Sequence, residues 1–121
     1  MAGFNNTTSG SYASVTGGSD NIASESRSSI TGGRSNEASG TDASVSGGFL
    51  NKATADRSSA SGGRENQALS TFAWTGGGYL NETTGIYSVV SGGNTNTSNG
   101  RYATVTGGRL NVTDLEDSVL P

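Results

Sequence analysis

One interval, 15 residues, recurs along the whole chain. Asparagine returns at this interval at Asn6, Asn21, Asn36, Asn51, Asn66, Asn81, Asn96 and Asn111. The pair Gly-Gly returns at the same interval at Gly17, Gly18, Gly32, Gly33, Gly47, Gly48, Gly62, Gly63, Gly77, Gly78, Gly92, Gly93, Gly107 and Gly108. No insertion or deletion interrupts either series. A fixed period of this kind predicts a solenoid, in which each repeat forms one coil that stacks on the next.

Each repeat contains two short alternating stretches, represented in the second repeat by residues 12–16 and 20–24. Alternation of small or apolar residues with polar ones is typical of strands. Fifteen residues leave no room for a crossover helix, so successive coils must pair as parallel β-structure. We therefore predict an all-β, parallel β-solenoid of about eight 15-residue coils with two short strands each. At about 4.8 Å per coil, such a rod is roughly 38 Å long.

Four columns of equivalent residues are predicted to face the interior. The column of Val15 holds Val15, Ile30, Val45, Ala60, Thr75, Val90, Val105 and Leu120. The other three are the columns of Ala13, of Ala23 and of the asparagines. Because a buried amide needs hydrogen-bond partners, the asparagines are predicted to bond to their equivalents above and below and to the turn backbone. We interpret this asparagine ladder as structural.

The turns are predicted at the Gly-Gly pairs, which supply positive φ, and near Gly40, Gly85 and Gly100. The whole chain, 1–121, is predicted to be a single domain with coils over about 3–113. Residues 114–121 carry Asp114, Glu116 and Asp117 and are expected to form a C-terminal cap or exit.

Composition argues against several kinds of chemistry. The chain has no Cys and no His, 30% hydrophobic residues and a net charge of −3. No thiolate, imidazole base or ordinary transition-metal site is available, and no phosphate-binding or metal-binding motif occurs. We therefore expect no enzyme, no cofactor, no metal site and no nucleic-acid partner. The start of the chain has no signal-peptide pattern, and no apolar run is long enough for membrane insertion.

The outward columns change character near residue 72. Earlier coils carry hydroxyls there, whereas later coils carry a stripe of Phe72, Trp74, Tyr87, Val89 and Tyr102. An exposed stripe of this kind favours a subunit interface, with a ligand or receptor patch as the alternative.

Charged residues are also placed in columns. Asp42 lies one coil from both Arg27 and Arg57, which predicts a surface ion ladder. Phe49 lies one coil from both Arg34 and Arg64, which predicts cation–π stacking. Leucines follow this second column at Leu50, Leu80 and Leu110, and they indicate a two-coil super-period with room for a second, smaller interface.

The stretch Ala13–Ser24, with Ser-Val-Thr-Gly-Gly-x-x-Asn-x-Ala-Ser, resembles the head repeats of YadA-like trimeric autotransporter adhesins and the β-roll modules of phage fibres. The resemblance covers roughly residues 3–113. It implies a left-handed β-roll that forms a homotrimer on a cell surface or a virion fibre, outside the cell. It further implies binding to a host surface protein, matrix or glycan receptor.

Two other functions remain open from the sequence. Paired hydroxyls on a flat solenoid face can order water, so an ice-binding solenoid is one alternative. Its candidate residues are Ser14, Thr16, Ser29, Thr31, Ser44, Ser46, Ser59 and Ser61. A filament that grows end to end through open β-edges is the other.

Overall fold

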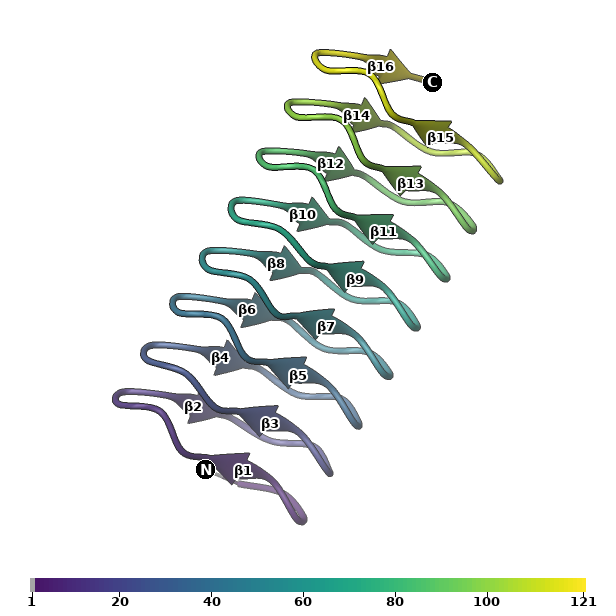
Figure 1. Cartoon of the computed structure of the whole chain (residues 1–121). Helices are drawn as coiled ribbons and strands as arrows, with labels where there is room; N and C mark the ends of the chain where they lie inside the picture. The colour runs from purple at the N-terminus through teal and green to yellow at the C-terminus, as the bar shows by residue number, and fades with distance from the viewer. Residues whose placement is uncertain (1) are drawn as a thin grey trace.

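The chain is a β-solenoid, as the 15-residue period predicts. The computed structural model describes residues 2–121, so Met1, with which the predicted domain begins, lies outside the described part. Each coil contributes one short strand to each of two parallel sheets, and the coils stack into a straight rod with the two termini at opposite ends (Figure 1).

The first sheet contains eight parallel strands with one asparagine before each. They are β1 (Thr7–Thr8), β3 (Ile22–Ala23), β5 (Glu37–Ala38), β7 (Lys52–Ala53), β9 (Gln67–Ala68), β11 (Glu82–Thr83), β13 (Thr97–Ser98) and β15 (Val112–Thr113). Each residue pairs with the residue 15 positions later, for example Ala38 with Ala53. This register places identical positions of successive coils directly above one another.

The second sheet contains the strands that carry the Val15 column. They are β2 (Ser14–Val15), β4 (Ser29–Ile30), β6 (Ser44–Val45), β8 (Ser59–Ala60), β10 (Trp74–Thr75), β12 (Val89–Val90), β14 (Thr104–Val105) and β16 (Val119–Leu120). A third ladder of single parallel bridges lies in the turn between the sheets. It joins Phe4, Ser19, Arg34, Phe49, Arg64, Tyr79, Asn94 and Arg109.

The strands are two residues long, shorter than the predicted five-residue stretches. The predicted stretches began at Tyr12 and Asp20, but these two residues have φ of 62° and 57° and turn the chain at corners. All eight residues in each of these two columns share this left-handed conformation. The N–H groups there point back along the rod: Asp20 donates to the Phe4 carbonyl at 3.0 Å, and Arg27 donates to the Ser11 carbonyl at 2.8 Å. These reversed bonds end the strands.

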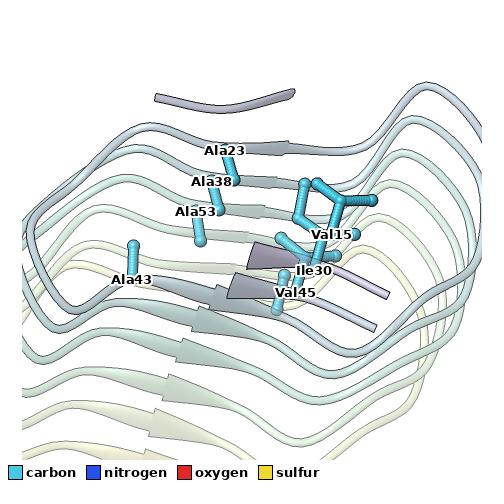
Figure 2. Packing of buried hydrophobic residues seen from close by; sticks show 8 residues of the cluster. Val15, Ala23, Ile30, Ala38, Ala43, Val45 and Ala53 are labelled. Atoms are coloured by element: carbon cyan, nitrogen blue, oxygen red, sulfur yellow. The ribbon is translucent and has the colours of Figure 1, made fainter. Parts of the chain in front are cut away.

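The interior is a single thin layer between the sheets. Ala23, Ala38 and Ala53 extend from one sheet toward Val15, Ile30 and Val45 of the other (Figure 2). The four predicted inward columns are buried in the middle coils and become partly exposed only at the ends of the rod. Small side chains are required because the two sheets lie close together.

The glycine turn depends on one glycine of each pair. The second glycine, represented by Gly78, has φ of 85°, and an added Cβ would lie 2.0 Å from the Gly93 carbonyl oxygen of the next coil. A Cβ on Gly77 would meet no atom within 4 Å. The other predicted turn is also present, closed by the Ala43 N–H to the Gly40 carbonyl at 3.1 Å. Its left-handed residue is Asp42, with φ of 58°, and not the glycine.

The C-terminal segment, expected to form a cap or exit, continues the winding. Asp117 occupies a left-handed corner with φ of 57°, and β16 pairs in register with β14. Residues 114–120 therefore follow the same path as the coils before them.

Candidate functional surfaces

The asparagine ladder holds successive coils together through the backbone. The Asn51 Oδ1 atom accepts the Asn66 backbone N–H at 2.9 Å. Its Nδ2 group donates to the Gly47 carbonyl at 2.8 Å and to the Gly63 carbonyl of the next coil at 3.0 Å. The predicted contact between equivalent asparagines therefore joins the side chain of one to the backbone N–H of the next, and not two side chains. The two Nδ2 protons are donated to turn carbonyls. The ladder is saturated, and it leaves no polar atom of Asn51 for a ligand.

The predicted aromatic stripe has two parts in the structure. At the turn between the odd-numbered and even-numbered strands, the rings of Phe72, Tyr87 and Tyr102 form a stack. The Phe72 and Tyr87 centroids are 4.7 Å apart with planes at 6°, and those of Tyr87 and Tyr102 are 5.2 Å apart at 9°. The three side chains are 37–44% exposed. The stack therefore presents ring edges to solvent, since neighbouring rings cover the faces of Tyr87.

Trp74 and Val89 form the second part, on the outer face of the adjacent sheet. They are direct neighbours on the paired strands β10 and β12. The Trp74 indole N–H donates to the Ser61 hydroxyl at 2.7 Å, and the side chain is 38% exposed. This bond orients the indole across the neighbouring coil. The sequence could not predict this hydrogen bond, because Ser61 is one of several small polar residues in its column and no pattern distinguishes it as the partner of Trp74.

Two arginines lie at the ends of the aromatic stack. The Arg57 guanidinium lies over the Phe72 ring at 5.1 Å, and that of Arg101 lies over the Tyr102 ring at 4.9 Å. The stack is thus a column of three rings between two cations. We name the set Phe72, Trp74, Tyr87, Val89 and Tyr102 the aromatic face.

The predicted ion ladder forms on one side only. Arg27 binds Asp42 with two hydrogen bonds of 2.5 and 2.9 Å, whereas Arg57 is directed to Phe72. The hydrogen bond from Arg27 is the main cause of the lowered pKa of Asp42, and the attraction of both guanidinium charges adds to it. The pKa of Arg27 is raised in turn by the same hydrogen bond. Both side chains are partly or largely exposed, so this pair mainly fixes side-chain positions.

The candidate ice-binding residues lie in two adjacent columns. Ser14, Ser29, Ser44 and Ser59 pair in register on neighbouring strands, and Thr16, Thr31, Ser46 and Ser61 follow them in sequence. Some of these hydroxyls bond to protein instead of water, because Ser44 bonds to Ser59 at 3.1 Å and Ser61 accepts from Trp74. The next coil places Trp74 and Gly76 in these columns and ends the array.

The surface of residues 2–121 opens into no pocket. Within that range no three Asp or Glu side chains gather into a group that could hold a metal ion. None of the described residues forms a helix able to cross a membrane.

No protein-family model matches the chain. No curated protein matches it significantly either.

Proposed function

We propose that the chain is a non-catalytic head module of a surface or phage fibre. In this proposal, three copies associate side by side through the aromatic face. The remaining outer surface then binds a host surface protein, matrix or glycan receptor outside the cell. The resemblance of the Ala13–Ser24 motif to adhesin head repeats supports this assignment.

The single observation that carries the proposal is the aromatic face itself. Burying exposed apolar surface stabilises an assembly by about 25 cal/mol for each Å² removed from water. Three rings that are already stacked lose little conformational freedom on association, which makes them suitable anchors of an interface.

The backbone at the corners determines how the three rings are placed. Phe72, Tyr87 and Tyr102 all have φ of 59°, a region that bulky residues rarely occupy. Asparagine and aspartate are more easily accommodated there, and Asp42 and Asp117 occupy equivalent positions. The corner conformation is common to the whole column, so it fixes where the three rings lie, one coil apart, whatever residue type occupies the position.

The test is the mass in solution of the wild-type chain and of a triple variant, Phe72→Asn, Tyr87→Asn and Tyr102→Asn. Because asparagine suits a left-handed corner, the variant is expected to keep its fold and its circular dichroism spectrum. We expect light scattering to give three times the 12.1 kDa chain mass for the wild type and a single chain mass for the variant.

A matched control replaces three leucines at the other left-handed corner, Leu50→Asn, Leu80→Asn and Leu110→Asn. This control removes exposed apolar side chains from the same backbone conformation and should remain trimeric. A wild-type chain that is monomeric at micromolar concentration would refute the assembly.

Ice binding is a second candidate, favoured by the in-register serines of β2, β4, β6 and β8. It predicts thermal hysteresis that disappears when Ser29 and Thr31 are replaced by bulky residues such as tyrosine. Unshaped ice crystals and zero hysteresis at millimolar protein would eliminate this candidate.

A further inference from the structure

The edge of the rod opposite the aromatic stack carries a second ordered column. The aromatic stack lies at turns that follow odd-numbered strands, whereas this column lies at the turns that follow even-numbered strands (Figure 1). Its central members alternate in type: Arg34, Phe49, Arg64 and Tyr79 are joined by successive parallel bridges. Arg109 follows two coils after Tyr79 in the same ladder.

Cation–π contacts hold the guanidinium groups of this column in place. The Arg34 Cζ atom lies 5.9 Å from the Phe49 ring centroid, and the Arg64 Cζ atom lies 5.7 Å from the same centroid. Arg64 also lies 5.4 Å from the Tyr79 ring. These contacts confirm the predicted stacking around Phe49. They also restrict the arginine side chains before any ligand arrives, which reduces the entropy lost on binding.

The arginines keep hydrogen-bonding capacity for a partner. The Arg64 Nε–H donates to the Glu65 carboxylate at 2.9 Å, and within residues 2–121 its two terminal nitrogens form no hydrogen bond. Within residues 2–121, Arg34 and Arg109 form no ion pair, and all three arginines are exposed. A planar guanidinium with exposed N–H groups is suited to two-point binding of a sulfate or carboxylate.

The spacing of the cations defines the kind of anion. Arg34 and Arg64 are two coils apart, about 9.6 Å along the rod, and Arg109 is three coils further, about 14 Å. This is a sparse row of fixed charges, suited to a linear polymer with widely spaced anionic groups. Leu50 and Leu80 are each 37% exposed beside the ring-bearing positions, and they offer apolar contact to the C–H face of a sugar.

The same geometry disfavours single-stranded nucleic acid. Such ligands are held by bases that stack on open aromatic faces and by dense positive charge. Here guanidinium groups lie over both sides of the Phe49 ring, and the chain carries a net charge of −3.

We propose that this Arg–aromatic edge (Arg34, Phe49, Arg64, Tyr79 and Arg109) binds an acidic polysaccharide that lies along the rod axis. The inference rests on the proposed adhesive role and names its ligand class. The anionic group is a sulfate or a uronic carboxylate, and the arms of the experiment distinguish these two sources.

The experiment measures affinity of the full chain for immobilised heparin, hyaluronan, neutral dextran and single-stranded oligothymidine at physiological salt. We expect binding to heparin or to hyaluronan, none to dextran, and much weaker binding to oligothymidine. Preference for heparin assigns sulfate as the recognised group, whereas equal binding to hyaluronan assigns carboxylate. The double variant Arg34→Gln and Arg64→Gln should lose at least about tenfold in affinity, because it removes two charge-assisted contacts.

The double variant Arg27→Gln and Arg101→Gln is the matched control, because it removes two arginines at the opposite edge. Its affinity should stay within about twofold of wild type, as expected for charges outside the site. Failure to bind either acidic polysaccharide overturns the inference, as does equal binding to oligothymidine or equal loss in the control.

The mass measurement described above separates this inference from the assembly. A trimer without polysaccharide binding leaves the proposed assembly standing and removes the ligand assignment. A monomer that binds polysaccharide through Arg34 and Arg64 supports the ligand assignment and refutes the proposed assembly.

Discussion

At the scale of single residues, the fold depends on two side-chain types that recur in every coil. Asparagine connects consecutive coils, and glycine permits their close approach at the turn. Neither contributes much apolar burial, which explains how a chain with 30% hydrophobic residues forms an ordered structure. In a globular protein, burial of large apolar side chains stabilises the core. In this rod, hydrogen bonds of the backbone and of the asparagine amides contribute a larger share of the stability.

The asparagine ladder predicts a position-dependent cost of substitution. Replacing Asn51 with alanine removes the partner of the Asn66 N–H and of the Gly47 carbonyl, and it leaves the Gly63 carbonyl with the Phe49 N–H alone. We expect the free energy of unfolding to fall by about 3 kcal/mol, measured by chemical denaturation. Asn6→Ala, in the half-buried first coil, is the control and should cost clearly less. Equal losses at the two sites would contradict a ladder of buried amides.

The glycine pair provides an internally controlled test. Gly78→Ala places a Cβ against the Gly93 carbonyl and forces alanine to φ of 85°, so we expect a loss of at least about 2 kcal/mol. Gly77→Ala, one residue earlier, meets no atom within 4 Å and should leave stability unchanged or raise it by about 0.5 kcal/mol. Thermal unfolding of the two variants measures the difference, which would vanish if both glycines were equivalent.

At the scale of strands and turns, each coil is a pair of two-residue strands joined by tight corners. Such short strands have little stability alone, and they persist because each one inside the rod pairs in register on both sides, while β1, β2, β15 and β16 at the ends pair on one side. The facing side chains are small: the mostly apolar Val15 column lies opposite alanine in four coils and opposite threonine or serine in the other four. Two of the polar side chains meet across the interior: the Thr75 and Thr83 hydroxyls bond at 2.9 Å, and Thr75 also donates to the Gln67 carbonyl at 2.9 Å.

This hydroxyl pair predicts non-additive substitutions. Thr75→Val leaves the Thr83 hydroxyl with only a 3.4 Å contact to the Gln67 carbonyl, so we expect a loss of about 1 kcal/mol. The double variant Thr75→Val and Thr83→Val removes both polar groups without changing their shape and should return to about wild-type stability. A double-mutant cycle by denaturant unfolding measures the coupling. Simple additivity would show that the two hydroxyls do not act as a pair.

The sequence predicts the inner columns well, because their residue types repeat at every coil. It predicts the corners poorly, because Tyr12, Leu50 and Phe72 have no preference for positive φ. A signal was nevertheless present: Asn5, Asp20 and Asp42 occupy the same two columns, and these residue types tolerate that conformation. The aromatic stack follows from one-coil spacing, whereas the Arg57 and Arg101 contacts at its ends depend on side-chain rotamers that no pattern specifies.

At the scale of the whole molecule, the rod separates a uniform interior from a varied exterior. The interior specifies the coil and is nearly the same from one end to the other. The exterior places rings at one edge and alternating arginines and rings at the opposite edge. The proposed assembly and the proposed ligand binding can therefore be altered by surface substitutions while the stack of coils is preserved.

The central claim is that one 15-residue coil is the unit of the structure, and whole-coil deletion tests it most directly. Removing residues 24–38 joins Ala23 to Ser39 in the correct register, whereas removing residues 24–37 shifts every later side chain by one position. Thermal unfolding followed by circular dichroism should show one cooperative transition for the 15-residue deletion, and a lower midpoint or a split transition for the 14-residue deletion, because the coil before the junction no longer stacks on the rest. Equal behaviour of the two variants would contradict the account.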